Sequence, residues 1–167
     1  YYVTADGFAA ASNSPHLEIF RKLGVEVLLM YDRIDEWVAS SLTGFEGKPL
    51  RSVAKGALDL DKLGGEAARL EQESKAGVHQ TLIDRIQKAL EDRASGVRVT
   101  HRLTDSPACL VADEHDIGGN MARMLKAAGQ KIPATRPILE INPDHPVVMR
   151  LKEEQRYFDD WAAVLFD

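Results

Sequence analysis

The sequence predicts an α/β fold of mixed α+β type, and three observations lead to this prediction. Short apolar runs typical of strands alternate with amphipathic helical segments along the 167 residues. The first segments follow one another closely as strand, helix and strand, which is typical of a right-handed parallel crossover. The second half combines a predicted hairpin with several amphipathic helices. We therefore expect a small βαβα module followed by a larger α/β module.

The first module is expected to open with a strand at residues 1–5 (YYVTA) and a helix after it. Ser14 is suited to the N-cap of this helix, and Pro15 to its first position. Gly24 stands just past the expected end, where the chain commonly turns into a left-handed conformation. Ser14 and Pro15 therefore predict where this helix begins, and Gly24 predicts where it ends.

A second strand and a second helix complete the first module. Residues 25–31 (VEVLLMY) form a nearly continuous apolar run, which predicts a parallel strand covered on both faces. Residues 33–42 (RIDEWVASSL) are expected to form a helix that exposes Trp37, a large apolar side chain.

A boundary is expected after this module. Residues 43–65 are rich in glycine and have little hydrophobic period, which is typical of a linker. We place the first module at residues 1–50, a linker at 51–65 and the second module at 66–167.

The second module is expected to begin with a helical segment at residues 66–94, which Gly77 divides into two pieces. Residues 97–112 (VRVTHRLTDSPACLVA) alternate and then turn at TDSP, which predicts a β-hairpin. The apolar stripe of the helical segment is expected to comprise Val78, Leu82, Ile83, Ile86, Ala89 and Leu90.

The last part of the chain is expected to contain an extended run, a turn and two helices. Asn142 or Asp144 could cap the first of these helices, with Pro146 in its first turn. The final residues keep helical spacing without a stop signal, and the first residue is not methionine. We therefore interpret the chain as part of a longer protein. The stripe of the final helix is expected to comprise Phe158, Trp161, Ala162 and Leu165.

The bulk composition excludes some classes of partner. The net charge of −5 and a pI near 5.6 argue against nucleic acid as a partner. No apolar run reaches the roughly 18 residues of a membrane span, and no signal peptide is visible. The single cysteine, Cys109, suits a reducing compartment. We expect a cytoplasmic protein that binds neither nucleic acid nor membrane.

The residues alone predict no catalytic centre. The acidic cluster Asp113–Asp116 (DEHD) contains metal-ligand types, but consecutive residues rarely converge on one ion. A loop that caps the next helix is the favoured interpretation, and a metal enzyme is the alternative. Cys109 lies in an apolar strand and is expected to be buried and inert. We expect no metal and no cofactor in this chain.

A narrow apolar stripe at residues 117–128 is the most distinctive feature. On a helix its members fall within an arc of roughly 80°. Such a stripe is either ordinary core or a surface for a partner. The glycines before it, the prolines after it and its methionines, which adapt to varied partners, favour a binding surface. The stripe comprises Ile117, Met121, Met124, Leu125 and Ala128.

Three blocks of the sequence resemble the ninety-kilodalton heat-shock chaperone family in its bacterial form. They are SPHLE…RKLGVEVLLMYDRIDEWV, VRVTHRLTDSPACLV and LEINPDHPVV, and they stand in the order typical of the family. The resemblance extends from Tyr1 to beyond Arg150.

The resemblance implies a division of labour within a longer chaperone. Residues 1–50 would be the last α/β part of its middle domain, and residues 66–167 its C-terminal domain of dimerisation and client binding, truncated at its end. The site for ATP and Mg would lie upstream, so this chain would not catalyse. The implied partners are non-native client proteins and, in the parent protein, a second copy in a homodimer.

The resemblance also implies which residues contact clients. The alternative to client binding is a purely structural dimerisation scaffold in which the 117–128 helix is buried as core. The implied client-binding residues are Glu36, Trp37, Ile117, Met121, Met124 and Leu125.

Overall fold

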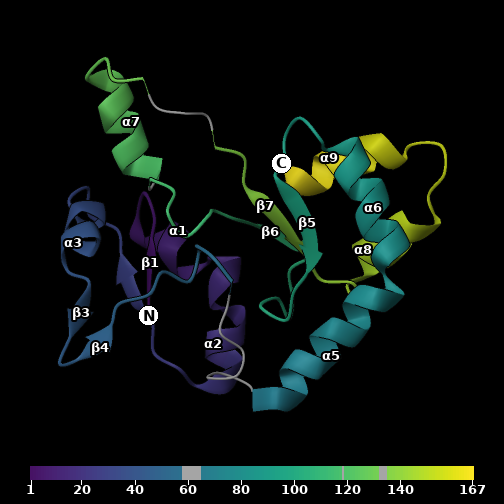
Figure 1. Cartoon of the computed structure of the whole chain (residues 1–167), viewed down its shortest axis with the longest axis horizontal. Helices are drawn as coiled ribbons and strands as arrows, with labels where there is room; N and C mark the ends of the chain where they lie inside the picture. Colours follow the sequence, from purple (N-terminus) through teal and green to yellow (C-terminus); the bar gives the residue numbers. More distant parts are fainter. Residues whose placement is uncertain (58–64, 118, 132–134) are drawn as a thin grey trace.

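The computed structural model describes residues 1–57, 65–117, 119–131 and 135–167. The predicted α/β fold of mixed type is confirmed, with helices around small sheets (Figure 1). The elements of the first module are β1 Tyr2–Thr4, α1 Phe8–Ser12, the 3-10 helix η1 Pro15–Leu17, α2 Glu18–Leu23, β2 Leu28–Met30, α3 Asp35–Ser41, β3 Gly44–Phe45 and β4 Lys48–Pro49.

The strand–helix–strand prediction for the first module is confirmed. β1 and β2 pair in parallel, with Val3 opposite Leu29. Ser14 is the N-cap of η1, Pro15 is its first residue, and Gly24 ends α2 with a φ of 67°. A left-handed φ suits glycine because it has no Cβ. The short helix α1 was not predicted.

The expectation that the second strand is covered on both faces is wrong. Leu28 in β2 is 60% exposed. β2 pairs with β1 on one side, and within the described residues no further strand pairs with it on the other. An apolar run therefore does not by itself distinguish a central strand from a strand with an open edge.

Part of the predicted linker is built into the fold. Ser52 forms an isolated parallel bridge with Tyr2, and Lys55 forms one with Ala112. The core of the first module extends to Val53, which is fully buried. Residues 58–64 of the predicted linker lie outside the described residues. This core comprises Val3, Ala11, Leu17, Phe20 and Val53.

The second module begins with two helices that meet at His79, two residues after the break expected at Gly77. Val78 is 70% exposed, so its assignment to the apolar stripe is wrong. The elements are α5 Gly65–Val78, α6 Gln80–Ala89, β5 Gly96–Val99, β6 Ala108–Val111, α7 Gly119–Ala127, β7 Ile138–Ile141, α8 Pro146–Glu153 and α9 Phe158–Phe166.

The predicted hairpin is wrong. Both strands exist, but β7 lies between them in the order β5-β7-β6. β5 pairs with β7 in parallel, and β6 pairs with β7 in the antiparallel sense. The turn at TDSP is real, yet the strand that arrives about 30 residues later takes the central position.

The main core packs α6, α8 and α9 on the three-stranded sheet (Figure 1). The final helix is confirmed as α9, where Phe158 and Ala162 are buried and Trp161 is 39% exposed. The cap expected from Asn142 or Asp144 is wrong, because the N-cap of α8 is His145. Its Nδ1 accepts a hydrogen bond from the amide of Val147 at 3.2 Å.

Candidate functional site

The predicted helix at 117–128 is confirmed as α7, and it lies beside α3 of the first module (Figure 1). Ile117 precedes the helix instead of belonging to it. No residue of α7 belongs to the described core clusters. α7 therefore lies outside the described cores and rests on the surface of the first module.

Glu36 on α3 meets the N-terminal end of α7. Its carboxylate Oε2 accepts a hydrogen bond of 2.6 Å from the backbone amide of Met121. The first amides of a helix have no partner within the helix and carry partial positive charge. A carboxylate from a neighbouring element thus does what an N-cap side chain normally does.

A second polar contact joins the same two parts of the chain. Arg123 of α7 forms a salt bridge with Asp6, which lies between β1 and α1. Hydrogen bonding to Asp6, together with its charge, raises the pKa of Arg123. Both side chains are more than 60% exposed, so solvent screens the pair.

The apolar residues around this contact remain accessible to solvent. Trp37 is 48% exposed, Ile117 43% and Met124 48%. Met121 and Leu125 are half-buried. None of these residues is core, so the packing that the scaffold alternative requires is not observed.

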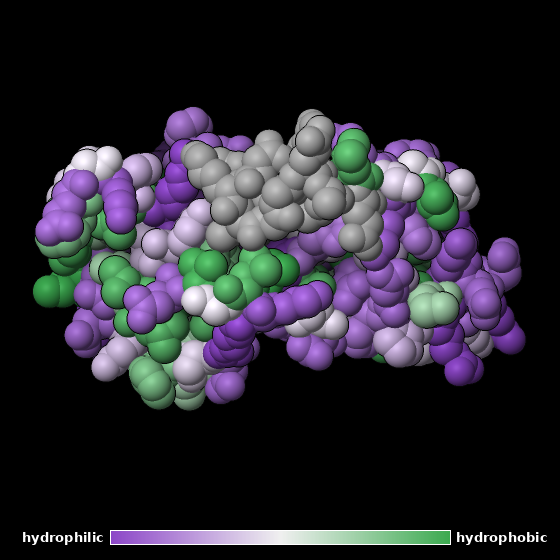
Figure 2. Space-filling model, turned by 90° about the horizontal axis from the view of Figure 1, so that it is seen from below, coloured by the Kyte–Doolittle hydropathy of each residue, from purple (hydrophilic) through white to green (hydrophobic). Residues whose placement is uncertain are grey.

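The first module presents further apolar side chains to solvent. Figure 2 shows apolar atoms over the part of the molecule that contains this module, whereas the opposite end is largely hydrophilic. Phe8 and Tyr31 contact each other edge to face, with ring centroids 5.6 Å apart. The exposed large apolar residues of this module are Phe8, Leu23, Leu28, Tyr31, Ile34, Trp37, Val38, Leu42 and Phe45.

Two hollows border the contact between α3 and α7. One, of about 240 Å³, is lined by Thr4, Glu36, Ala39, Ile117 and Met121 among others. The other, of about 440 Å³, is lined by Asp6, Tyr31, Arg33, Arg123 and Met124. Both hollows mix charged and polar side chains with a few apolar ones, such as Ile117, Met121 and Met124.

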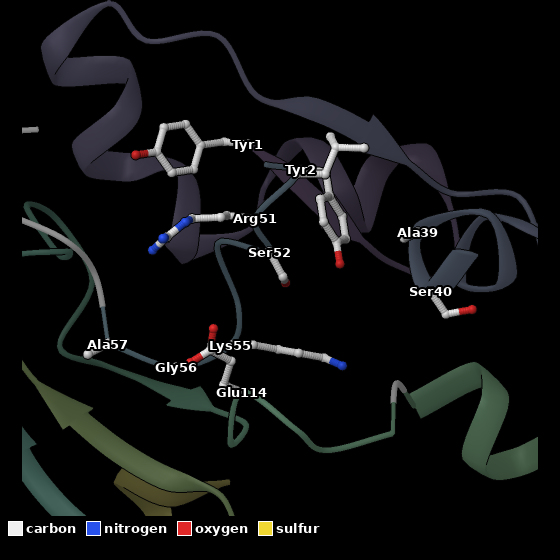
Figure 3. Close-up of a pocket in the computed structure, with 11 residues that line it drawn as sticks. Tyr1, Tyr2, Ala39, Ser40, Arg51, Ser52, Lys55, Gly56, Ala57 and Glu114 are labelled. Carbon is white, nitrogen blue, oxygen red and sulfur yellow. The ribbon is translucent and has the colours of Figure 1, made fainter. Parts of the chain in front are cut away.

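A polar pocket of about 300 Å³ lies beside this surface (Figure 3). In Figure 3 the Tyr1 and Tyr2 rings point in different directions from β1. The Lys55 ammonium donates to the carbonyl oxygen of Asp116, in the loop before α7. Burial and the nearby Glu36 carboxylate raise the pKa of Tyr2. The bond from Lys55 to Asp116 holds the loop that leads into α7.

The acidic cluster Asp113–Asp116 forms a hydrogen-bonded loop. Asp113 Oδ1 accepts from the amide of His115, and Asp116 Oδ2 accepts from the amide of Asp113. Within the described ranges, no group of three or more His, Cys, Asp or Glu side chains could hold a metal ion. The side chains of Asp113 and Asp116 therefore bond within the loop, and at the start of α7 it is Glu36 that accepts from a backbone amide, so capping of α7 by this loop stays a prediction.

A buried charged cluster, which sequence reasoning missed, joins the two modules. Glu140 in the central strand β7 accepts hydrogen bonds of 2.9 Å from Arg102 and 2.6 Å from Arg98. Arg102 is fully buried and also donates to the carbonyl oxygens of Val53 and Gly56. Burial raises the pKa of Glu140, but Arg102 and Arg98 lower it more, so the net shift is downward.

A second carboxylate strengthens this junction. Glu18 of α2 accepts hydrogen bonds from the amides of Thr104, Asp105 and Ser106. Burial raises the pKa of Glu18, but these bonds and one from the Ser106 hydroxyl lower it overall. The backbone amides of the TDSP turn therefore bind the Glu18 carboxylate and join α2 to the second module.

The half-buried His16 and the buried Cys109 lie near the same junction. Burial, assisted by Arg102, lowers the pKa of His16 to about 4. Burial, assisted by the Glu140 carboxylate, raises the pKa of the Cys109 thiol to about 12. The expectation that Cys109 is buried is confirmed, and a neutral thiol is a poor nucleophile.

The sequence holds one signal for the charged cluster of Glu140, Arg98 and Arg102. Glu140 is a single acidic residue in the apolar run ILEI, where a buried charge needs a partner.

None of the helices in the described part of the chain combines the length and the apolar character needed to span a membrane.

The fold and the surface together define a class of protein. The chain is an α/β protein in which an exposed amphipathic helix rests beside a second apolar surface.

The chain belongs to the Hsp90 family, since the family model described as "Hsp90 protein" matches residues 1–166. It is 66% identical over 167 residues to the chaperone protein HtpG of Aromatoleum aromaticum. It is 62% identical to HtpG of Dechloromonas aromatica and 57% identical to HtpG of Nitrosospira multiformis. All 167 residues are matched in each case, and they span 26% of each relative.

Proposed function

We propose that this chain is the client-binding part of a chaperone and contributes to its homodimerisation. The observation that carries the proposal is the exposed apolar surface formed by α3 and α7, described above. The proposed client-binding residues are Glu36, Trp37, Ile117, Met121, Met124 and Leu125. ATP and Mg binding are assigned to other parts of the family's full-length proteins, and we place the activity in the cytoplasm.

The strength of such binding follows from the area that a client would cover. Burial of apolar surface contributes about 25 cal/mol per Å² before the costs of association. A contact of a few hundred Å² therefore gives weak, reversible binding. Weak binding suits a chaperone because clients must leave. Trp37 and Met124, each 48% exposed, would gain most from being covered.

The test is suppression of aggregation. Heat-unfolded citrate synthase is mixed with the 167-residue chain or with the variant Met121→Ser/Met124→Ser/Leu125→Ser. Light scattering follows aggregation, and circular dichroism checks folding. We expect the wild type to slow aggregation and the folded variant to lose most of this effect.

A matched control removes apolar surface elsewhere. Leu70, Val78 and Met149 are 53%, 70% and 57% exposed and lie on α5 and α8. The variant Leu70→Ser/Val78→Ser/Met149→Ser should suppress aggregation as the wild type does. Equal loss in both triple variants would assign the effect to general hydrophobicity and contradict the proposed site.

Dimerisation rests on a different surface. On α9, Val164 is 74% exposed and Trp161 is 39% exposed, so the helix offers apolar side chains to a second copy. Sedimentation velocity of the wild type and of Trp161→Ser/Val164→Ser separates this role from client binding. A monomeric wild type at high concentration would contradict a contribution of this chain to dimerisation.

A further inference from the structure

We propose that Asp6, Glu36 and Arg123 form a latch that holds α7 beside α3 in the arrangement that binds clients. The inference rests on the proposed function and deepens it. Glu36, one of the proposed client-binding residues, then contributes to client binding by positioning α7. Asp6 and Arg123 gain a role that the client-binding assignment did not include.

The first element of the latch is the Glu36 carboxylate. Its oxygen is 2.6 Å from the amide nitrogen of Met121, in the first turn of α7. A hydrogen bond to an ionised acceptor is stronger than a neutral one, and the helix dipole adds to it. Because this carboxylate oxygen faces α7, a client that covers the surface meets Trp37 and Met124 before it meets Glu36.

The second element is the pair between Asp6 and Arg123. Arg123 lies at the middle of α7 (Gly119–Ala127), so the pair secures the helix beyond its first turn and from a different part of the first module. Lys55 holds the loop before α7 through the carbonyl oxygen of Asp116. These contacts come from separate segments, and together they fix both the position and the direction of the helix.

The latch has a consequence for binding because the apolar residues stay exposed while it is closed. Trp37 on α3 and Met124 on α7 are each 48% exposed in the latched arrangement. A client segment that touches both pays no cost for bringing them together. Opening the latch separates the two surfaces, and binding to both then requires ordering α7 first.

The experiment measures the position of α7 independently of clients. Spin labels are attached to the 167-residue chain at Ser41→Cys and Lys126→Cys, two exposed sites on α3 and α7. The buried Cys109 does not compete for the label, as its thiol is shielded from solvent. Distances are recorded for the wild type, for Asp6→Asn/Glu36→Gln and for the charge swap Asp6→Arg/Arg123→Asp.

The second readout is affinity for reduced, carboxymethylated α-lactalbumin, a permanently unfolded protein. We expect the double variant to broaden the label distances and to weaken binding about fivefold, the size of one lost charge–helix contact. The charge swap keeps Glu36 and forms the pair between positions 6 and 123 with reversed charges, so it should keep narrow distances and most of the affinity. Circular dichroism confirms that each variant folds.

Other outcomes separate this inference from the proposed function. Unchanged distances in the double variant would overturn the latch, even if binding weakens, and would make Glu36 a direct client contact. Broadened distances with unchanged affinity would overturn its effect on clients. No binding by a wild type with narrow distances would overturn the proposed function, and with it the client role of the latch, while leaving the contact itself intact.

Discussion

The junction around Glu140 and the contact that holds α7 both connect the first module with later parts of the chain, but they differ in burial. Arg102 and Glu140 are at most 2% exposed, and Arg102 also donates to the backbone carbonyl oxygens of Val53 and Gly56. Asp6 and Arg123 are more than 60% exposed. Buried charge is costly to separate, whereas an exposed pair exchanges easily with water. One contact therefore defines the fold, and the other can open without unfolding.

The largest effect should follow from breaking the junction. Arg102→Ala leaves the Glu140 carboxylate with less compensation in a buried site, so the free energy of unfolding should fall by about 3–5 kcal/mol. Urea denaturation at pH 7 measures the loss. Arg98→Ala is the matched control, because the Arg98 side chain is 34% exposed and should cost less. Equal losses for both variants would contradict the importance of burial.

A somewhat smaller effect should come from acid. The pKa of His16 is about 4 in the folded chain, below the ordinary 6.5, so the unfolded chain binds the proton first as the pH falls. Stability should drop by about 3 kcal/mol between pH 6.5 and pH 4.

The control for this pH dependence is His16→Gln, which cannot titrate. Glu18 and Glu140 have lowered pKa values, so their contributions are present above about pH 4.5 and are lost as the pH falls further. Both chains share that loss. The difference between wild type and variant across pH 4–6.5 therefore reports on His16. Parallel curves would show that His16 is not coupled to the junction.

The smallest effect on global stability is expected at α7. Glu36→Gln should leave the urea midpoint unchanged, because α7 belongs to none of the described cores. Amide hydrogen exchange in α7 should nevertheless accelerate about fivefold, since local opening becomes easier. A shift of the midpoint as large as that of Arg102→Ala would erase the contrast between the two contacts.

The sequence predicted features that depend on local chemistry. Pro15 and Gly24 bound the first helical segment as expected, because the fixed φ of proline and the left-handed φ of glycine are properties of single residues. The helix at α7 followed from periodicity, and the exposure of Trp37 followed from its place on a polar helix.

The features that were missed depend on residues far apart in the chain. Arg102 is fully buried although β5 ends at Val99, so alternation along the strand does not indicate its burial. Its partner Glu140 is 38 residues away. In the same way, the bond between Glu36 and Met121 spans 85 residues, and no local pattern indicates it.

The central position of β7 has a consequence for how the second module forms. Until residues 138–141 are available, β5 and β6 have no strand between them, and Arg98 and Arg102 lack the Glu140 carboxylate. Pairings between distant segments are slow because the intervening loop must close first. During synthesis from the N-terminus, the insertion of this one strand is expected to complete the sheet and neutralise the arginines in the same event. Its arrival would set the pace of folding for the whole module.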